Sequence, residues 1–137
     1  MQPATFAIRL LPGNERTVDG IRIGEIRIGT FVERFAVYPI DGSVEDVAAR
    51  WEGELRLLID GASAVGLPTA SNMTWVLYRI GNEVLVQQFL MLPGNGPRLA
   101  RGGRVVDIPE RTTVDEDGVR ISEWATSVEA VSAFAAG

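Results

Sequence analysis

Apolar residues along the chain recur with two different periods, which separates expected strands from expected helices. Ile21 and Ile23 alternate with a polar residue, the period of two that is typical of a half-buried strand. Residues 31–38 are rich in β-branched and aromatic side chains and predict another strand, which Pro39 ends. With the apolar segment that closes at residues 8–11, the first third of the chain predicts strands.

The unit Ile-Arg-Ile-Gly occurs twice in this region, at residues 21–24 and again at residues 26–29. The shift of five positions is odd, so it carries the second pair of isoleucines to the opposite face of a strand. Gly24 is therefore predicted to mark a bulge or a bend. Residues 12–14, with the sequence Pro-Gly-Asn, predict a turn before this unit.

From residue 43 onward the apolar period becomes that of an α-helix. Ser43 and Asp46 resemble a capping box, with Asp in place of the usual Glu or Gln, and Gly61 is expected at the end of the helix. The apolar residues recur at spacings of four, four and three: Val47, Trp51, Leu55 and Leu58. This single stripe predicts a helix over residues 44–60 with one face toward the core.

Two strands are predicted after the helix. Residues 66–68, with the sequence Gly-Leu-Pro, predict a loop. Residues 73–80 and 83–91 predict strands joined by Gly81 and Asn82, which suit a type II′ hairpin turn. Because both strands are apolar on both faces, the hairpin should be central in a sheet. Two glutamines at 87 and 88 interrupt it, and they need hydrogen-bond partners if they are buried.

The C-terminal part predicts a second hairpin and a short helix. An Asp-Gly pair at residues 117–118 lies between β-prone runs at 111–114 and 119–124, a strong hairpin signal. Thr126 and Glu129 have the spacing of a capping box for a final helix.

These elements predict one domain that spans residues 1–137 and belongs to the α+β class. We expect an antiparallel sheet of about five or six strands. The long helix should cover one face of this sheet, and the short C-terminal helix should pack at its edge. A chain of 137 residues is long enough to bury a core without a metal or a disulfide.

Composition excludes much of enzyme chemistry, because the chain has no His, Cys or Lys. Triads that use His, thiolate nucleophiles, zinc-cysteine sites and lysine Schiff bases are therefore excluded. The 18 acidic and 13 basic residues give a formal net charge of −5. This balance argues against nucleic acid as a direct partner and suits a basic protein partner, although it also serves ordinary solubility.

No apolar stretch is long enough to predict a transmembrane helix. Arg9 lies within the first apolar run and no basic segment precedes it, so a signal peptide is not expected. The absence of Cys fits a reducing compartment. We therefore expect a cytoplasmic protein that does not bind membranes.

Three local features have competing interpretations. The first is the acidic run Asp-Glu-Asp at residues 115–117. It can be interpreted as a solvated hairpin tip, as a protruding contact for a partner or as a divalent cation site, but it does not fit the twelve-residue calcium loop. Three arginines at 98, 101 and 104 lie near paired glycines without the pattern of a phosphate-binding loop, which favours a solvated loop. Trp75 and Trp124 lie near loops and are either core residues or anchors for a partner.

The C-terminal half resembles one family, the immunity proteins of bacterial contact-dependent growth inhibition systems. The resemblance spans residues 74–134, and its most distinctive part runs from Arg-Thr-Thr at 111–113 to Ser-Glu-Trp at 122–124. Residues 1–72 carry no motif that matches. The segments that carry the resemblance are Thr-Trp-Val-Leu-Tyr at 74–78, Val-Leu-Val-Gln at 84–87, Arg-Thr-Thr at 111–113, Asp-Glu-Asp-Gly at 115–118 and Ile-Ser-Glu-Trp at 121–124.

The resemblance implies a cytoplasmic protein without catalytic activity, cofactor or metal. Such a protein binds the C-terminal toxin domain, often a nuclease, of a cognate surface effector, and we expect a 1:1 heterodimer. The expected contacts are four carboxylates at and before the hairpin tip, one carboxylate after it and an apolar anchor: Glu110, Asp115, Glu116, Asp117, Glu123 and Trp124.

Two other functions remain open from the residues alone. A small-molecule binding module or a carboxylate-dependent enzyme would have an apolar pocket with convergent acids in the sheet. A self-associating protein would use the apolar hairpin 73–91 and form a stable homo-oligomer.

Overall fold

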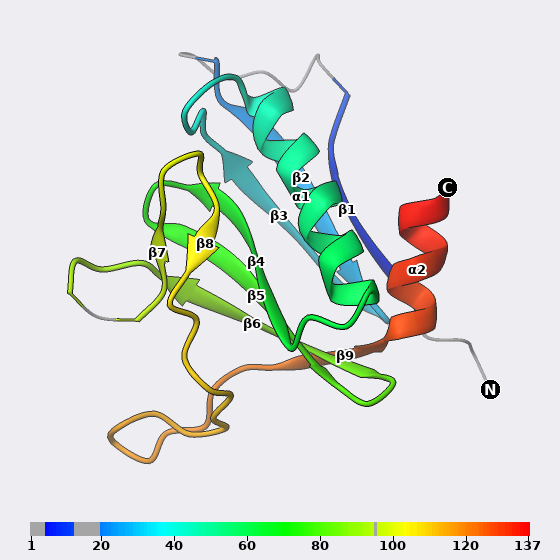
Figure 1. The fold of residues 1–137 in the computed structure, drawn as a ribbon, viewed down its shortest axis with the longest axis vertical. Helices are drawn as coiled ribbons and strands as arrows, with labels where there is room; N and C mark the ends of the chain where they lie inside the picture. Colours follow the sequence, from blue (N-terminus) through cyan, green and yellow to red (C-terminus); the bar gives the residue numbers. More distant parts are fainter. Residues whose placement is uncertain (1–4, 13–19, 95) are drawn as a thin grey trace.

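The computed structural model describes residues 5–12, 20–94 and 96–137, so the turn predicted at residues 12–14 lies largely outside it. The first sheet is antiparallel with the strand order β1-β2-β3 (Figure 1). Its strands are β1 (Phe6–Leu10), β2 (Arg22–Ile28) and β3 (Phe31–Val37). The first third of the chain therefore forms strands, as its apolar alternation predicts.

A second antiparallel sheet has the order β4-β5-β6-β9, and a separate pair of short strands, β7 and β8, forms a hairpin. Within this sheet β5 and β6 occupy the two central positions, which confirms the expectation from their apolar faces. The strands are β4 (Ala64–Ala70), β5 (Met73–Ile80), β6 (Glu83–Leu90), β7 (Arg98–Leu99), β8 (Val105–Val106) and β9 (Trp124–Ser127).

The long helix α1 (Val44–Ile59) forms where the stripe predicts it. Ser43 is the N-cap, and both hydrogen bonds of the capping box are present, with Asp46 Oδ2 accepting from the Ser43 amide at 2.9 Å. Its apolar stripe is buried against residues of both sheets in one continuous core. Figure 1 shows α1 crossing the place where the two sheets meet. The helix therefore covers one face, as expected.

The two sheets are joined at both ends of β3. The Tyr38 amide, just beyond β3, donates to the Thr69 carbonyl of β4 at 2.8 Å. The rings of Phe31 and Trp124 stack at 4.1 Å between centroids, which joins the start of β3 to β9. The expected single sheet is thus divided in the described part of the chain, while the α+β class with antiparallel strands, one long helix and one short helix is confirmed.

The short helix α2 (Val128–Ala136) packs beside two edge strands, β1 and β9, and against α1. The predicted cap is wrong by one residue. Ser127 is the N-cap, and its hydroxyl accepts from the Ala130 amide at 3.0 Å. The hydroxyl of Thr126 is used elsewhere, because it donates to the Thr5 carbonyl at 2.9 Å and thereby ties β9 to the start of β1.

Two predictions about strand breaks are corrected. The register between β2 and β3 runs without a shift past Gly24, so this glycine is not a bulge. A Cβ at Gly24 would lie 2.7 Å from the Phe35 ring, so the glycine makes room for that ring. Residues 66–68 are not a loop but part of β4, where Pro68 is tolerated because β4 is an edge strand of its sheet.

Of the two predicted hairpins, the one at Gly81 has regularly paired strands, whereas the one at residues 117–118 does not. Gly81 has a φ of +61° and Asn82 is not among the described non-glycine residues with positive φ, which fits the predicted type II′ turn. In the second hairpin the flanking runs pair only through an isolated bridge between Val114 and Arg120. No helix in the described ranges is long and apolar enough to cross a membrane.

Candidate functional site

The outer face of the second sheet, opposite α1, is covered by a chain segment and not by a helix. Val76, Tyr78 and Leu85 form a small buried cluster on this face, with Ile108 packed on it. We name residues 105–113 the strap. At its start Val105 lies so close to Gly66 that a Cβ there would come within 2.5 Å of the Val105 side chain. The strap therefore sits on the sheet because β4 presents a glycine at this point.

Two side chains of the central strands hold the strap by its carbonyl groups. The Tyr78 hydroxyl donates to the Pro109 carbonyl at 3.0 Å. Burial raises the pKa of Tyr78 to about 12, so the hydroxyl keeps its proton. The Gln87 side-chain amide donates to the Thr112 carbonyl at 2.9 Å, and Gln87 is fully buried. The glutamine that interrupts the apolar strand thus finds a partner on the strap.

Arg111 of the strap forms a two-pronged ion pair with Glu123. Its Nε donates to Oε2 at 2.8 Å, and its Nη2 donates to Oε1 at 2.6 Å. Gln87 Nε2 also donates to Glu123 Oε2, at 2.7 Å. The hydrogen bond from Arg111 holds the pKa of Glu123 below its usual value, and the same bond raises the pKa of Arg111. We name Arg111, Glu123 and Gln87 the clasp.

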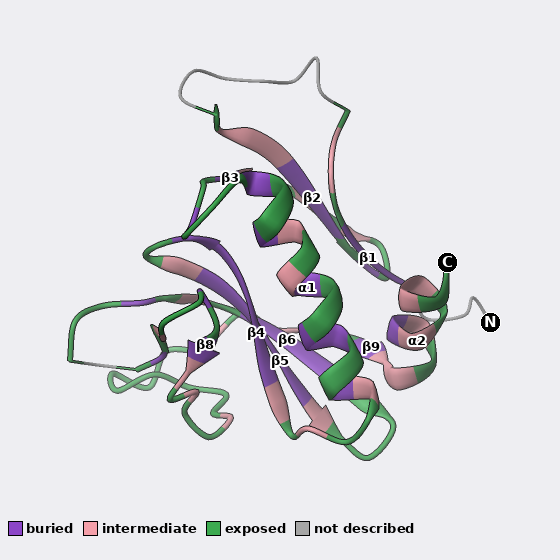
Figure 2. Cartoon of the chain, turned by 45° about the horizontal axis from the view of Figure 1, so that its top comes forward, coloured by how far each residue is buried: buried purple, intermediate pink, exposed green. Residues whose placement is uncertain are grey.

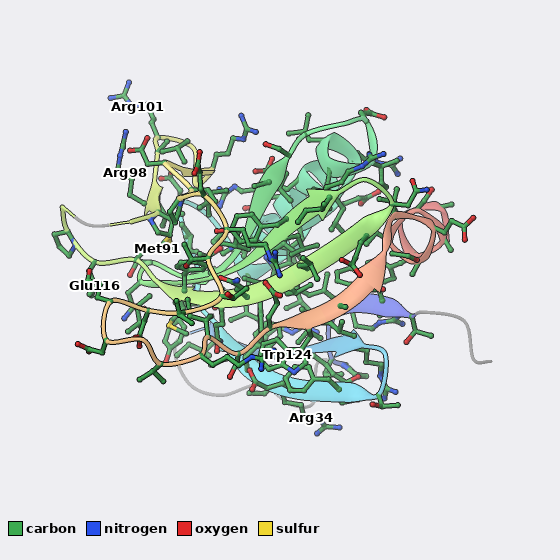
Figure 3. The ribbon with its side chains drawn as sticks, turned by 90° about the horizontal axis from the view of Figure 1, so that it is seen from below. Arg34, Met91, Arg98, Arg101, Glu116 and Trp124 are labelled. Atoms are coloured by element: carbon green, nitrogen blue, oxygen red, sulfur yellow. The ribbon has the colours of Figure 1, made fainter. Side chains whose placement is uncertain are left out.

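Between Arg111 and Glu123 the chain leaves the sheet as an exposed loop. We name residues 114–120 the acidic loop, and all seven are exposed. Asp115 Oδ1 accepts from the amides of Asp117 and Val119, both at 2.9 Å, and so shapes the turn. Figure 2 shows this segment as an exposed loop away from the buried core, and Figure 3 shows Glu116 at its outer end.

The six residues predicted as contacts fall into two groups. Glu110, Asp115, Glu116 and Asp117 are exposed and form no ion pair with the described residues. Glu123 is half-buried and engaged by the clasp. Trp124 is half-buried between Phe31 and Trp75, and it also lines a surface depression of 530 Å³ below the acidic loop.

Sequence reasoning missed the residues that organise this region. Arg111 and Tyr78 lie in the segments that carry the family resemblance, but nothing local in the sequence assigned them a role in this region. The signal for Gln87 was available, because a glutamine inside an apolar strand requires partners once it is buried. Trp75 is fully buried, so of its two interpretations the core residue is correct.

The arginine-rich hairpin is a separate feature. Arg98 pairs with Asp107 at 2.6 Å, and Arg104 pairs with the buried Glu54 of α1 at 3.2 Å. Figure 3 shows Arg98 and Arg101 projecting from this hairpin, apart from Glu116. Of the three arginines at 98, 101 and 104, two therefore have carboxylate partners within the chain. Within the described ranges, no group of three or more acidic side chains is placed to hold a metal ion.

The family to which the chain belongs is decided by its match to a family model. Residues 42–134, more than half of the chain, match the model described as "CdiI N-terminal domain". The chain belongs to this family. The CdiI family comprises the immunity proteins of contact-dependent growth inhibition, so the resemblance seen in the sequence is confirmed. The match also includes α1 and β4, in the part of the chain where the sequence carried no recognisable motif.

A solved structure supports the same assignment to CdiI. It is described as the "CdiA-CT/CdiI toxin and immunity complex from Enterobacter cloacae". The two chains share 26% identity over 96% of this chain and 97% of that chain, with a TM-score of 0.73. No curated protein matches the chain significantly. The similarity therefore extends over nearly the full length of both chains.

Proposed function

We propose that this member of the CdiI family is a cytoplasmic immunity protein that neutralises the C-terminal toxin domain of its cognate effector. The proposal is supported by the similarity to a chain of a CdiA-CT/CdiI complex over nearly the full length. In this proposal the protein acts by occupying a surface of the toxin in a 1:1 complex and carries out no reaction itself. Nucleic acid and membranes are not among its direct partners.

The observation that carries the choice of surface is the set of unpaired carboxylates near the acidic loop. Glu110, Asp115, Glu116 and Asp117 are exposed, and the described residues provide them with no cationic partner. Four such charges on one side of a protein with net charge −5 favour a basic partner. A nuclease needs a basic groove for its substrate, so we propose a nuclease toxin whose groove receives this loop.

The apolar part of this surface lies beside the carboxylates. Val114 and Val119 are exposed by 50% and 60% at the two sides of the loop. Trp124 opens onto the depression below the loop. We propose that these side chains supply the apolar contact at the centre, while the carboxylates form charge pairs around it.

The experiment that tests the function is co-expression with the toxin domain encoded beside this gene. We expect growth in the presence of the intact protein and growth arrest without it. A complex of one copy of each chain should elute from size exclusion, with its mass given by light scattering. Toxicity that the wild-type protein leaves unchanged would contradict the cognate pairing.

The surface is tested by charge reversal at two loop positions. E116K/D117K should weaken toxin binding by at least about tenfold and slow association, most strongly at low salt. The matched control is D60K/E129K, at the C-cap of α1 and in the first turn of α2. It makes the same change in net charge at exposed positions away from the loop that also form no ion pair with the described residues. Equal losses for both pairs would show that only net charge matters and would remove the loop from the interface.

A further inference from the structure

Among the described residues, the acidic loop forms no hydrogen bond with the two sheets, and its Arg120 interacts with Glu123 only through charge. Within the described residues, its hydrogen bonds stay between residues 113 and 121: Asp115 with Val119, Gly118 with Asp115, and Ile121 with Thr113. The isolated bridge between Val114 and Arg120 closes its neck. These bonds fix the shape of the loop but not its direction relative to the two sheets.

The clasp is the link between this loop and the rigid sheet. Arg111 lies before the loop and Glu123 lies after it, so their two-pronged ion pair ties together the two chain segments from which the loop emerges. Gln87, from the central strand β6, donates both to Glu123 and to the Thr112 carbonyl, one contact on each side of the loop. The fully buried side chain of Gln87 is thus hydrogen-bonded to the chain on both sides of the acidic loop.

Glu123 is better suited to holding the loop than to contacting a partner. Its side chain is only 16% exposed, and each of its oxygens already accepts a hydrogen bond. A partner cation at Glu123 would have to compete with Arg111, whose guanidinium forms the bidentate geometry that arginine favours.

We infer that Arg111, Glu123 and Gln87 are positioning residues that hold the acidic loop in the direction needed to bind the toxin domain. This inference rests on the proposed function. A loop that is already oriented loses little conformational freedom on binding, whereas a loop released at its base loses more, and affinity falls. Opening the clasp should therefore lower the affinity for the toxin domain by freeing the loop, and not by removing a direct contact between the clasp and the toxin domain.

The variant that tests the clasp is E123Q, which keeps the side-chain shape but removes the charge. Its matched control is E25Q, which makes the same change at another low-exposure Arg–carboxylate contact, in the other sheet. Glu25 of β2 accepts from Arg27 Nε at 2.9 Å, and its side chain is 10% exposed. Binding of the purified toxin domain should be about tenfold weaker for E123Q and unchanged for E25Q.

The free protein provides a readout that does not depend on the toxin. Hydrogen exchange of the Asp117, Val119 and Ile121 amides should become several-fold faster in E123Q, while E25Q leaves it unchanged. Exchange in β5 and β6 should stay slow in both variants, which shows that the sheet remains folded. Unchanged loop exchange in E123Q would overturn the inference.

A double-mutant cycle separates positioning from direct contact. If Arg111 and Glu123 act only as a pair, R111Q, E123Q and R111Q/E123Q should lose similar affinity, because either change opens the clasp. Additive losses in the double variant would overturn the inference and make each residue a separate contact. If E116K/D117K binds weakly but E123Q binds normally, the inference fails while the proposed function stands. If the wild type does not bind, both fail.

Discussion

The indole nitrogen of Trp51 donates to the carbonyl oxygen of Pro68 at 2.7 Å inside the core. This bond joins the middle of α1 to β4 at the place where the pairing of β4 with β5 shifts its register, between Pro68 and Ala70. A carbonyl group at such an irregularity lacks the regular partner that a sheet provides. The predicted core tryptophan therefore has a polar role as well, which fixes where the helix sits along the sheet.

We expect W51F to destabilise the protein by about 2–4 kcal/mol. The change removes part of a buried ring and leaves the Pro68 carbonyl without its donor. Urea denaturation followed by circular dichroism measures the loss in the free energy of unfolding. W75F is the matched control, because Trp75 is also fully buried and its indole nitrogen has no hydrogen-bond partner among the described residues. A loss for W51F no larger than for W75F would contradict the role of the bond.

Two glycines should respond to alanine in opposite directions. G66A places a Cβ within 2.5 Å of the Val105 side chain, so the strap must move away from the sheet. We expect a loss of about 1–3 kcal/mol in unfolding free energy. Gly53 lies within α1 and is exposed, and a Cβ there meets nothing within 4 Å. G53A should therefore stabilise the protein by about 0.5–1 kcal/mol through its better helix propensity.

Thermal unfolding of the two alanine variants measures both effects. Their comparison controls for the loss of backbone freedom that every Gly-to-Ala change causes in the unfolded chain. A stabilised G66A would mean that Val105 does not rest on β4 as described.

Asp115 should act on toxin binding in two ways, through its charge and through the shape of the loop. D115N removes the charge but keeps an oxygen that accepts from the Asp117 and Val119 amides. D115A removes both, so we expect it to weaken binding about three to ten times more than D115N does. Surface plasmon resonance with the toxin domain measures the two affinities.

The control for this comparison is Glu116, whose side chain forms no hydrogen bond with the described residues. E116Q and E116A should bind with similar affinity to one another. A gap between them as large as that between D115N and D115A would show that side-chain truncation alone causes the loss.

The stability that Glu123 provides should depend on pH. Its pKa is held below the usual value of 4.5, chiefly by the hydrogen bond from Arg111. The stabilisation is therefore present above the pKa of the unfolded chain and is lost as the pH falls through the folded pKa. We expect the wild type to be more stable than E123Q near about pH 7, with the difference shrinking toward about pH 3.

Urea denaturation of both proteins over this pH range measures that difference. The comparison between variants is needed because the pKa values of Glu25 and Asp46 are also lowered, by hydrogen bonds from Arg27 and from Ser43 respectively. These groups contribute equally to both proteins and cancel. A difference that stays constant with pH would contradict an ionised Glu123 in the clasp.

Elements whose signals are local were predictable. The capping box at Ser43, the stripe through Trp51 and the turn at Gly81 each depend on residues a few positions apart, and all three formed as expected. The exposed acidic turn belongs to the same class, since Asp115 and Gly118 shape it through bonds within the loop.

The errors came from residues whose role depends on distant neighbours. Pro68 breaks most strands, but β4 is an edge strand and its missing N–H is not needed there. Thr126 and Ser127 both can cap a helix, and the choice depended on Thr5, 121 residues away, which accepts from the Thr126 hydroxyl. Such neighbours cannot be inferred from spacing along the chain.

The sequence by itself determined the α+β class, the position of α1, the position of α2 to within one residue at its cap, the exclusion of chemistry that needs His, Cys or Lys, and the family resemblance. It also placed the carboxylates of residues 115–117 on one exposed turn. Only the tertiary structure decided that Glu123 turns inward to Arg111 and Gln87 while the loop points outward. The physical reason is that the buried amide nitrogen of Gln87 and the half-buried carboxylate of Glu123 need hydrogen-bond partners, and these come together only when the strap lies across the sheet.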